Sequence, residues 1–286
     1  MPVYDEYGTQ LNSVYDGSGL SLGSAFDAEG NQIFSASIVL PVPSGNLDAS
    51  SVIPLPDLHG QAHGFTCTGL AFDEGSNTFI VGDIGILQPG DTPIRSQLVR
   101  MPMGLNAVIE TIPLYSTFQN MHDVQGVAID TSDNSIWFCS PSENLIRNIT
   151  PSGESVDALS VTNPSGIAYD STDDSLWILT YAGQILHMSK TGTVLGSFSF
   201  AYNETLDQCF LDPARGYLYI TAGANYSGRN NVYLFNTETH EQSVACSVDS
   251  YSVEGIWIGP DRMIILNDGY YHSATVPVNQ ANIYTL

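Results

Sequence analysis

The chain has 286 residues, of which 43% are hydrophobic and 10% aromatic, a composition typical of globular proteins. Seven Lys and Arg residues stand against 30 Asp and Glu residues, so the formal net charge at pH 7 is −23. Nucleic-acid binding needs clustered cations, so we expect no nucleic-acid partner. No stretch reaches the roughly 18 consecutive apolar residues of a membrane-spanning helix, and we expect no membrane insertion.

The first 34 residues carry three copies of an 11-residue repeat. The copies begin at Tyr4, Tyr15 and Phe26, and each reads aromatic-Asp, two variable residues, Gly, two more residues and an aliphatic residue. Asp followed by Gly favours a tight turn, because Asp bonds its own backbone and Gly accepts a positive φ. A unit this short buries little apolar surface alone, so we expect residues 1–34 to be an attachment or oligomerisation segment. The alternative is a loosely packed N-terminal arm.

These repeats resemble the N-terminal repeats of tail-fibre and tail-associated proteins of bacteriophages and prophages. In those proteins, Tyr-Asp-x-x-Gly-x-x-Leu units precede a variable globular module. The resemblance implies a virion protein that docks through residues 1–34 on other tail proteins or on copies of itself. The N-terminus, Met1 to Asp5, lacks the basic stretch and apolar core of a signal peptide, so we expect synthesis in the host cytoplasm.

The rest of the chain repeats a second pattern, a Gly-X-apolar-Asp phrase followed by a turn and a run of strand-forming residues. The phrases lie 40 to 57 residues apart and begin at Gly69, Gly126, Gly166, Gln208 and Gly255. Repeats in the forties built from short strands are typical of β-propellers, with one four-stranded sheet per repeat. We therefore predict an all-β protein with a five-bladed β-propeller over residues 35–286.

Within each repeat, the Gly-X-apolar-Asp phrase is expected to form the innermost strand, and its Asp to begin a turn into the second strand. The turn residues are Asp73, Asp130, Asp170 and Asp212. The tryptophans Trp137, Trp177 and Trp257 are expected in the core between blades. The four cysteines have no metal-type spacing and are expected to be free, as small hydrophobic residues.

The fifth repeat is too short for four strands, because only residues 282–286 remain for a third strand after the run that begins at Met263. We predict that residues 33–41 supply the missing strand and so close the ring without an open edge. The alternative is a six-bladed propeller, in which residues 44–65 form a degenerate blade.

The inner-strand phrases resemble those of NHL-type, gluconolactonase-type and phytase-like propellers. The resemblance is carried by residues 125–130 and by residues 254–257 followed by Asn267 and Asp268. The resemblance implies a propeller architecture, and by itself it does not indicate an activity.

Residues that precede the inner-strand Gly, and those that end or follow the second strands, are expected to meet at one mouth of the central channel. The first group comprises Thr68, Gln125, Ser165, Asp207 and Glu254. Carboxylate oxygens suit Ca²⁺ or Mg²⁺. The carboxylates expected to converge near this mouth are therefore the candidate metal ligands Asp83, Asp123, Asp207, Glu254 and Asp268. A similar ring of acid and amide residues holds the ion in metal-dependent lactonase-like propellers, but here the third repeat offers only Ser165 and Asn163.

Sugar rings stack their C–H faces on tyrosine, while amides and carboxylates bond the sugar hydroxyls, and loops rich in Tyr, Asn, Gly and Ser suit such binding. The candidate glycan-binding residues are Tyr181, Asn225, Tyr226, Asn267, Asp268, Tyr270 and Tyr271. Our leading hypothesis is a tail-associated structural or receptor-binding protein that recognises a host-surface glycan. One alternative is a glycosidase-like or lactonase-like hydrolase that uses the channel-mouth carboxylates, and another is a purely structural filament or decoration subunit. No Gly-x-Ser-x-Gly nucleophile elbow occurs, and we assign no catalytic residue.

Overall fold

A computed structural model describes residues 40–56, 66–85, 96–114, 117–118, 123–223, 228–268 and 279–286, and six short strands before residue 36. The chain divides into two compact units, Met1–Leu40 and Pro41–Leu286. Among the described residues, no helix has the length and apolar character needed to cross a membrane.

The first unit contains three antiparallel strand pairs. They are β1 (Val3–Tyr4) with β2 (Gln10–Leu11), β3 (Val14–Tyr15) with β4 (Ser21–Leu22), and β5 (Ser24–Phe26) with β6 (Gln32–Ser35). The aromatic residue that opens each 11-residue copy takes the same place in its pair: Tyr4 is opposite Gln10, Tyr15 opposite Ser21 and Phe26 opposite Gln32. The attachment role of this segment stays a prediction.

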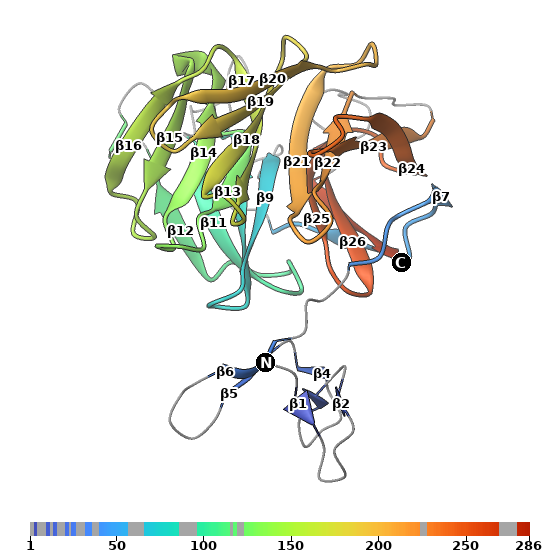
Figure 1. Cartoon of the computed structure of the whole chain (residues 1–286). Coiled ribbons are helices and arrows are strands. Elements are labelled where there is room, and N and C mark those ends of the chain that lie inside the picture. Colours follow the sequence, from blue (N-terminus) through green and yellow to red (C-terminus); the bar gives the residue numbers. More distant parts are fainter. Residues whose placement is uncertain are drawn as a thin grey trace. The chain divides into compact units, whose positions relative to one another are not determined.

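The second unit is a five-bladed β-propeller, as predicted (Figure 1). Blade 1 contains β9 (Cys67–Asp73), β10 (Thr78–Asp83), β11 (Gln97–Pro102) and β12 (Glu110–Pro113). Blade 2 contains β13 (Val127–Ile129), β14 (Ile136–Ser140), β15 (Leu145–Ile149) and β16 (Ser155–Ser160), with a 3-10 turn η1 (Pro141–Glu143). Blade 3 contains β17 (Pro164–Asp170), β18 (Ser175–Thr180), β19 (Gln184–Ser189) and β20 (Val194–Ser199).

Blades 4 and 5 each recruit a strand from the N-terminal side of the propeller. Blade 4 contains β21 (Leu206–Asp212), β22 (Tyr217–Ala222), β23 (Asn230–Asn236) and β24 (Gln242–Val248), and β7 (Gly45–Leu47) adds to β24 in parallel. Blade 5 contains β25 (Val253–Ile258), β26 (Arg262–Asn267), β27 (Gln280–Thr285) and, as its outer strand, β8 (Ser51–Pro54).

The strand that completes blade 5 differs from the predicted one. We expected it from residues 33–41, but β8 pairs with β27, and β6 pairs with β5 instead. The six-bladed alternative is also wrong, because β7 and β8 extend blades 4 and 5 instead of forming a blade of their own. Residues 33–41 and residues 51–54 both contain strand-forming residues, so local propensity could not choose between them. The choice depends on which segment pairs with β27 in the folded ring.

The inner strands form a closed ring in the order β9, β13, β17, β21, β25 and back to β9. The inner-strand glycines let neighbouring backbones approach closely: a Cβ on Gly126 would lie 2.7 Å from the backbone nitrogen of Ile167 in the next blade. Blade 4 has Gln208 in place of the glycine, and its amide donates a hydrogen bond to the Ser165 carbonyl at 3.1 Å. Close contact between inner strands therefore explains the Gly in the repeated phrase.

The aspartates that end the inner strands make turns, as predicted. Their side chains accept backbone hydrogen bonds inside the turn: Ser76 to Asp73, Ser132 to Asp130, Thr172 to Asp170 and Ala214 to Asp212. The fourth residue after each aspartate has a positive φ: Asn77 (53°), Asn134 (62°), Asp174 (59°) and Gly216 (62°). Asn, Asp and Gly are the residues that adopt this conformation most readily.

The predicted core residues lie between blades. The Trp257 ring of blade 5 is 5.2 Å from the Phe79 ring of blade 1, and the Trp177 ring of blade 3 is 5.6 Å from the Phe235 ring of blade 4. Trp137 is buried in a cluster with residues of blade 3. The four cysteines are free and buried, as expected.

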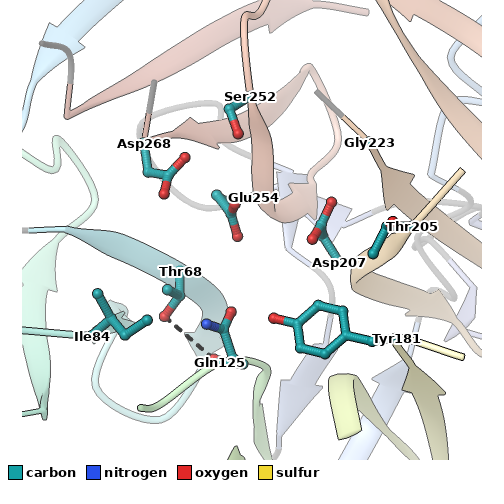
Figure 2. A pocket seen from close by; sticks show the side chains of 10 residues that line it. All are labelled: Thr68, Ile84, Gln125, Tyr181, Thr205, Asp207, Gly223, Ser252, Glu254 and Asp268. Carbon is teal, nitrogen blue, oxygen red and sulfur yellow. Dashed lines mark hydrogen bonds between the residues drawn. The ribbon is translucent and has the colours of Figure 1, made fainter. Parts of the chain in front are cut away.

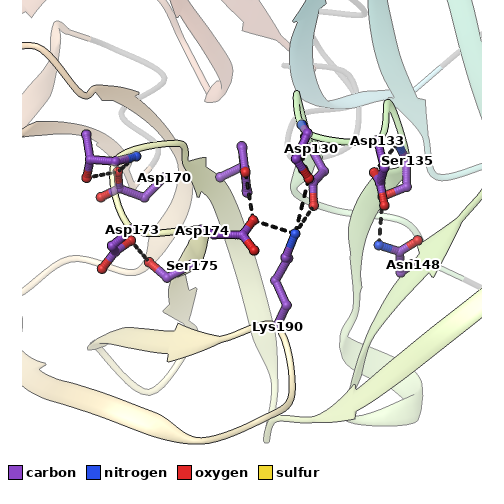
Figure 3. A network of polar contacts seen from close by, with 12 residues as sticks. Asp130, Asp133, Ser135, Asn148, Asp170, Asp173, Asp174, Ser175 and Lys190 are labelled. Carbon is purple, nitrogen blue, oxygen red and sulfur yellow. Dashed lines mark hydrogen bonds and ion pairs between the residues drawn. The ribbon is translucent and has the colours of Figure 1, made fainter.

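A cation bridges blades 2 and 3 on the side of the turns (Figure 3). Lys190, the one lysine of the sequence, bonds Asp130 of blade 2 at 2.8 Å and also pairs with Asp174 of blade 3. Burial raises the pKa of Asp130, but the hydrogen bonds from Lys190 and Ser132 outweigh it, so that the pKa lies below its usual value. The pair therefore contributes stability at pH values above the ordinary titration of aspartate.

We expect Lys190→Met to lower the free energy of unfolding at pH 7 by about 1–3 kcal/mol, because the buried Asp130 carboxylate loses its cation. A carboxylate with a lowered pKa loses its stabilising effect as the pH falls below about 4, so the penalty should shrink at pH 3. Urea unfolding at both pH values measures it. Arg262→Met removes an exposed pair with Asp261 and is the control; equal losses in both variants would contradict the prediction.

Candidate functional site

A cavity of about 350 Å³ lies where the inner strands begin, at one mouth of the channel (Figure 2). Residues from all five blades line it: Thr68, Ile84, Gln125, Tyr181, Thr205, Asp207, Gly223, Ser252, Glu254 and Asp268. Each lies at the start of an inner strand or directly after a second strand. The structure thus brings residues of both groups of positions to the mouth where the repeat pattern had placed them.

A β-bulge shapes the start of the inner strand in blades 1, 3, 4 and 5. In blade 5, Val253 pairs with Asn267 and Ile256 with Ile265, so Glu254 and Gly255 together face a single residue of β26. The same offset in blade 4 includes Asp207. Bulges re-aim side chains, and in blades 1, 4 and 5 they include the lining residues Thr68, Asp207 and Glu254. The sequence did not predict these bulges, although the second bulged residue is a Gly in three of the four blades, namely Gly69, Gly166 and Gly255.

The cavity is strongly acidic. Figure 2 shows the carboxyl groups of Asp207, Glu254 and Asp268 around one space with the Tyr181 hydroxyl. Burial raises the pKa of Glu254 well above its usual value, and the charges of Asp268 and Asp207 raise it further. Burial and Asp268 likewise raise the pKa of Asp207, against a hydrogen bond from the Gly223 backbone. These acids therefore resist being ionised together.

Burial and the same acidic groups also shift the pKa of the Tyr181 phenol. Burial raises its pKa, and the charges of Glu254, Asp207 and Asp123 add to the effect. Tyr181 therefore stays protonated at neutral pH and is available as a hydroxyl donor. Among the lining residues that the structure describes, none is Lys, Arg or His.

Two of the five predicted metal ligands are not among the lining residues. Asp83 accepts hydrogen bonds from the Thr66 and Gly85 backbone and from the Gln97 amide, at 3.3, 3.0 and 2.9 Å. Asp123 accepts from the backbone and hydroxyl of Ser142, at 3.0 and 2.5 Å. Asp207, Glu254 and Asp268 remain as oxygen donors, and the Ca²⁺ or Mg²⁺ ion stays a prediction.

Of the predicted glycan-binding residues, Tyr181 and Asp268 line the cavity. Asn267 is buried beside it, and its side-chain oxygen accepts a hydrogen bond from the Ser252 backbone at 3.4 Å. Asn225, Tyr226, Tyr270 and Tyr271 lie outside the described residues.

The prediction also named Ser165, which is fully buried and does not line the cavity. It missed four lining residues, namely Ile84, Thr205, Gly223 and Ser252. Ile84 and Gly223 directly follow second strands, while Thr205 and Ser252 directly precede inner strands. The positions expected to follow the second strands, taken without regard to residue type, include Ile84 and Gly223. Thr205 and Ser252 lie two residues before Asp207 and Glu254 and are outside the predicted positions.

A second polar cluster lies in blade 3, where potential ligand atoms of Asp170, Asp173 and His187 are within 4.8 Å of one another. Ser175 Oγ lies 2.6 Å from His187 Nε2 and donates to Asp173 Oδ1 at 2.5 Å, while Trp177 Nε1 donates to Asp170 Oδ2 at 3.0 Å. Both Ser175 and Asp173 face the same imidazole nitrogen, which is not the geometry of a Ser-His-Asp relay. We infer that these hydrogen bonds have a structural role, because they connect the turn that contains Asp170 and Asp173 with β18 and β19.

The cavity can bind a polar ligand of small size. Its volume falls within the range of ligand pockets, about 300–1,000 Å³. Carboxylates accept hydrogen bonds, the Gln125 amide donates and accepts them, and the Tyr181 ring offers an apolar edge with a hydroxyl. The Thr68 hydroxyl is partly engaged, because it donates to the Val124 carbonyl at 2.9 Å.

Comparison with known proteins identifies the architecture. No protein-family model matches the chain, and no curated protein matches it in sequence. Among solved structures, a Myxococcus xanthus glutaminyl cyclase is similar, with a TM-score of 0.56 at 11% identity, over 84% of this chain and 99% of the cyclase. A chain of a nidogen/laminin complex is similar with a TM-score of 0.53 at 15% identity, over 71% of this chain and 72% of the other. At such identities the similarity shows a propeller fold and no more.

Proposed function

We propose that this protein is a tail-associated receptor-binding protein whose propeller recognises a host-surface glycan at the channel-mouth cavity. One observation carries the binding part of the proposal: carboxylates, an amide, hydroxyls and a tyrosine from five blades converge on one cavity of ligand size. A sugar ring offers hydroxyls around its edge and C–H groups on its faces. A ring of hydrogen-bonding groups beside a tyrosine complements both.

The virion part of the proposal has separate support. The 11-residue repeats resemble those of phage tail fibres, and their aromatic residues take the same register position in three successive strand pairs. Short strand pairs bury little surface by themselves, which suits a segment that packs against neighbouring chains. The propeller would then present its cavity to the host.

The proposal is tested with the full chain on an array of bacterial surface glycans, followed by titration calorimetry with the best ligand. We expect binding without release of product, and Tyr181→Phe should weaken binding of the best ligand about tenfold, because a hydrogen bond from this hydroxyl to the ligand is worth roughly 1–1.5 kcal/mol. Tyr251→Phe removes a hydroxyl from an exposed tyrosine and is the control. Absence of binding to every glycan would overturn the proposal.

The hydrolase alternative has one observation in its favour. A carboxylic acid with a raised pKa, as at Glu254, is the form needed for a general acid in glycoside hydrolysis. The same incubations should therefore be assayed for new reducing ends. If new reducing ends appear with the natural protein and are absent with Glu254→Gln, the protein is a hydrolase and not only a binding protein.

A further inference from the structure

We infer that the cavity binds the non-reducing end of a glycan chain and excludes the internal residues of that chain. This inference rests on the proposed glycan binding and adds which part of the glycan enters the site. Its basis is the shape of the cavity, because the ring of inner strands closes it at its inner end.

Neighbouring blades touch all around this ring, at the level of the residues that line the cavity. Each contact joins the backbone of one inner strand to the next blade. The contacts, in ring order, are the Gly69 N–H to the Gln125 carbonyl at 3.2 Å, the Gly126 N–H to the Ser165 carbonyl at 2.7 Å, the Gln208 amide to the Ser165 carbonyl at 3.1 Å, the Thr221 hydroxyl to the Glu254 carbonyl at 2.9 Å, and a Cβ on Gly255 that would lie 2.6 Å from the Thr68 carbonyl oxygen. Every boundary between blades is thus closed at this level.

The described inner strands leave an opening that is too narrow for a sugar. Strands in hydrogen-bond contact lie about 4.8 Å apart, so five of them in a ring place their backbones about 4 Å from the axis. The backbone atoms occupy about 2 Å of that radius, half of a carbon–carbon contact distance. The remaining opening, about 2 Å in radius, admits water molecules in single file and excludes a pyranose ring. The cavity is therefore blind, and a sugar enters and leaves it through the mouth.

The polar groups that line the cavity differ in exposure. Thr68 and Ser252 are each 2% exposed and Glu254 is 5% exposed, and we call these three the buried lining residues. Thr205, which also lines the cavity, is exposed. Figure 2 shows the side chains of both kinds around one space with the Tyr181 hydroxyl. A ligand therefore has to pass the exposed rim and reach into the cavity to contact the buried lining residues.

Only the end of a chain fits a blind cavity of this size. An internal sugar has two glycosidic linkages, and both neighbours would have to turn back through the same mouth. A terminal sugar has one linkage, which can point outward. The volume of about 350 Å³ lies near the lower end of the range for ligand pockets, about 300–1,000 Å³, and so suits a short chain end. Surface glycans are attached through their reducing ends, so the end that is free to enter is the non-reducing one.

A terminal residue also presents a hydroxyl group that an internal residue lacks. The buried lining residues offer hydroxyl and carboxyl groups, which form hydrogen bonds with sugar hydroxyls. In an internal residue, one of those sugar hydroxyls carries the next sugar, which would meet the wall of the cavity instead of solvent. Steric contact of this kind rejects the wrong ligand, so we expect chain extension at the non-reducing end to prevent binding.

The test compares forms of one oligosaccharide that differ only at their ends. Titration calorimetry of the full chain uses the array glycan of highest affinity, the same glycan methylated on the hydroxyls of its non-reducing terminal residue, and the same glycan lengthened at its reducing end. We expect methylation to weaken binding at least about tenfold and lengthening to change it less than about threefold.

A second measurement counts binding sites on the polymer. The O-polysaccharide that contains the same glycan is titrated before and after partial acid cleavage, which creates new non-reducing ends without a change in total sugar. We expect the binding capacity per gram to rise in proportion to the number of chain ends. A capacity that stays constant on cleavage would show that internal residues bind and would overturn the inference.

A matched pair of variants locates the bound end. Ser252→Val adds bulk among the buried lining residues and should weaken binding at least about tenfold, whereas Ser197→Val makes the same change on the exposed face of β20 and should not. Thermal unfolding confirms that both variants fold, and the ligand comparisons need neither. Unchanged binding by folded Ser252→Val would place the glycan outside the cavity and overturn the inference.

The outcomes separate this inference from the proposed function. Equal binding of the methylated and intact glycans would overturn the inference and leave glycan recognition standing. Absence of binding to every glycan of the array would overturn both.

Discussion

Gly126→Ala is expected to lower the free energy of unfolding by about 3 kcal/mol, the upper end of the usual cost of overpacking. A Cβ at this position would lie 2.7 Å from the Ile167 nitrogen and 2.8 Å from the Gly166 Cα and the Ser165 carbonyl oxygen. These atoms belong to the backbone of the next inner strand, so no side chain can move aside. The Gly126 N–H also donates to the Ser165 carbonyl at 2.7 Å, and separation of the strands would break that bond.

Thermal unfolding measures the effect, with an expected fall in Tm of about 6–12 °C for a propeller of this size. Gly75→Ala is the matched control, because its Cβ would meet only Asp73 Oδ1, at 3.4 Å, in ordinary contact. A glycine replaced at a compatible backbone position leaves stability unchanged or slightly raised. Similar Tm values for the two variants would show that the inner strands do not depend on close approach at Gly126.

Glu254→Gln is expected to act in opposite directions on stability and on binding. The variant should weaken binding of the best glycan ligand by about tenfold, since a hydrogen bond accepted by a carboxylate becomes one accepted by a neutral amide. It should raise the free energy of unfolding at pH 7 by on the order of 1–2 kcal/mol, because a buried carboxylate beside two others no longer needs to ionise. Functional sites commonly trade stability for function in this way.

The pH dependence fixes the sign of that gain. Burial, then Asp268 and Asp207, raise the pKa of Glu254 above that of an unfolded glutamate, about 4.3. The folded protein therefore loses stability as the pH rises above that value, and the advantage of Glu254→Gln should vanish below about pH 4. Urea unfolding at pH 4 and pH 7 measures it, with the exposed Glu238→Gln as control. An advantage that is constant with pH would contradict this account.

Much of the architecture could be predicted from the sequence because it depends on local chemistry. Each inner-strand aspartate accepts a backbone hydrogen bond within its own turn, so its role does not depend on distant parts of the chain. The tryptophans lie within runs of strand-forming residues, where so large an apolar ring is expected to be buried. The repeat of these features at intervals in the forties predicted a toroidal arrangement of small sheets.

The candidate site was predictable by position and less so by residue. The pattern placed Asp207, Glu254 and Asp268 at one mouth, and the structure brings them to one cavity. It placed Asp83 there as well, yet that carboxylate turns to the Thr66 backbone and the Gln97 amide. Sequence spacing gives the strand end on which a residue lies, whereas the rotamer and its hydrogen-bond partners decide where its side chain points.

The sequence alone determined the propeller architecture, the turns between inner and second strands, and the acidic character of the channel mouth, since each follows from short-range patterns that repeat. It left the number of blades open between five and six, which the pairing of β7 and β8 decided. Tertiary structure alone decided that β8 closes blade 5, that β7 covers the edge of β24, and that bulges turn Glu254 and Asp207 to the cavity. These features depend on pairing between segments as distant as Ser51 and Ile283, where several edges are open to any strand-forming segment. Local preference does not select which segment pairs with which edge. The free energy of the closed ring does.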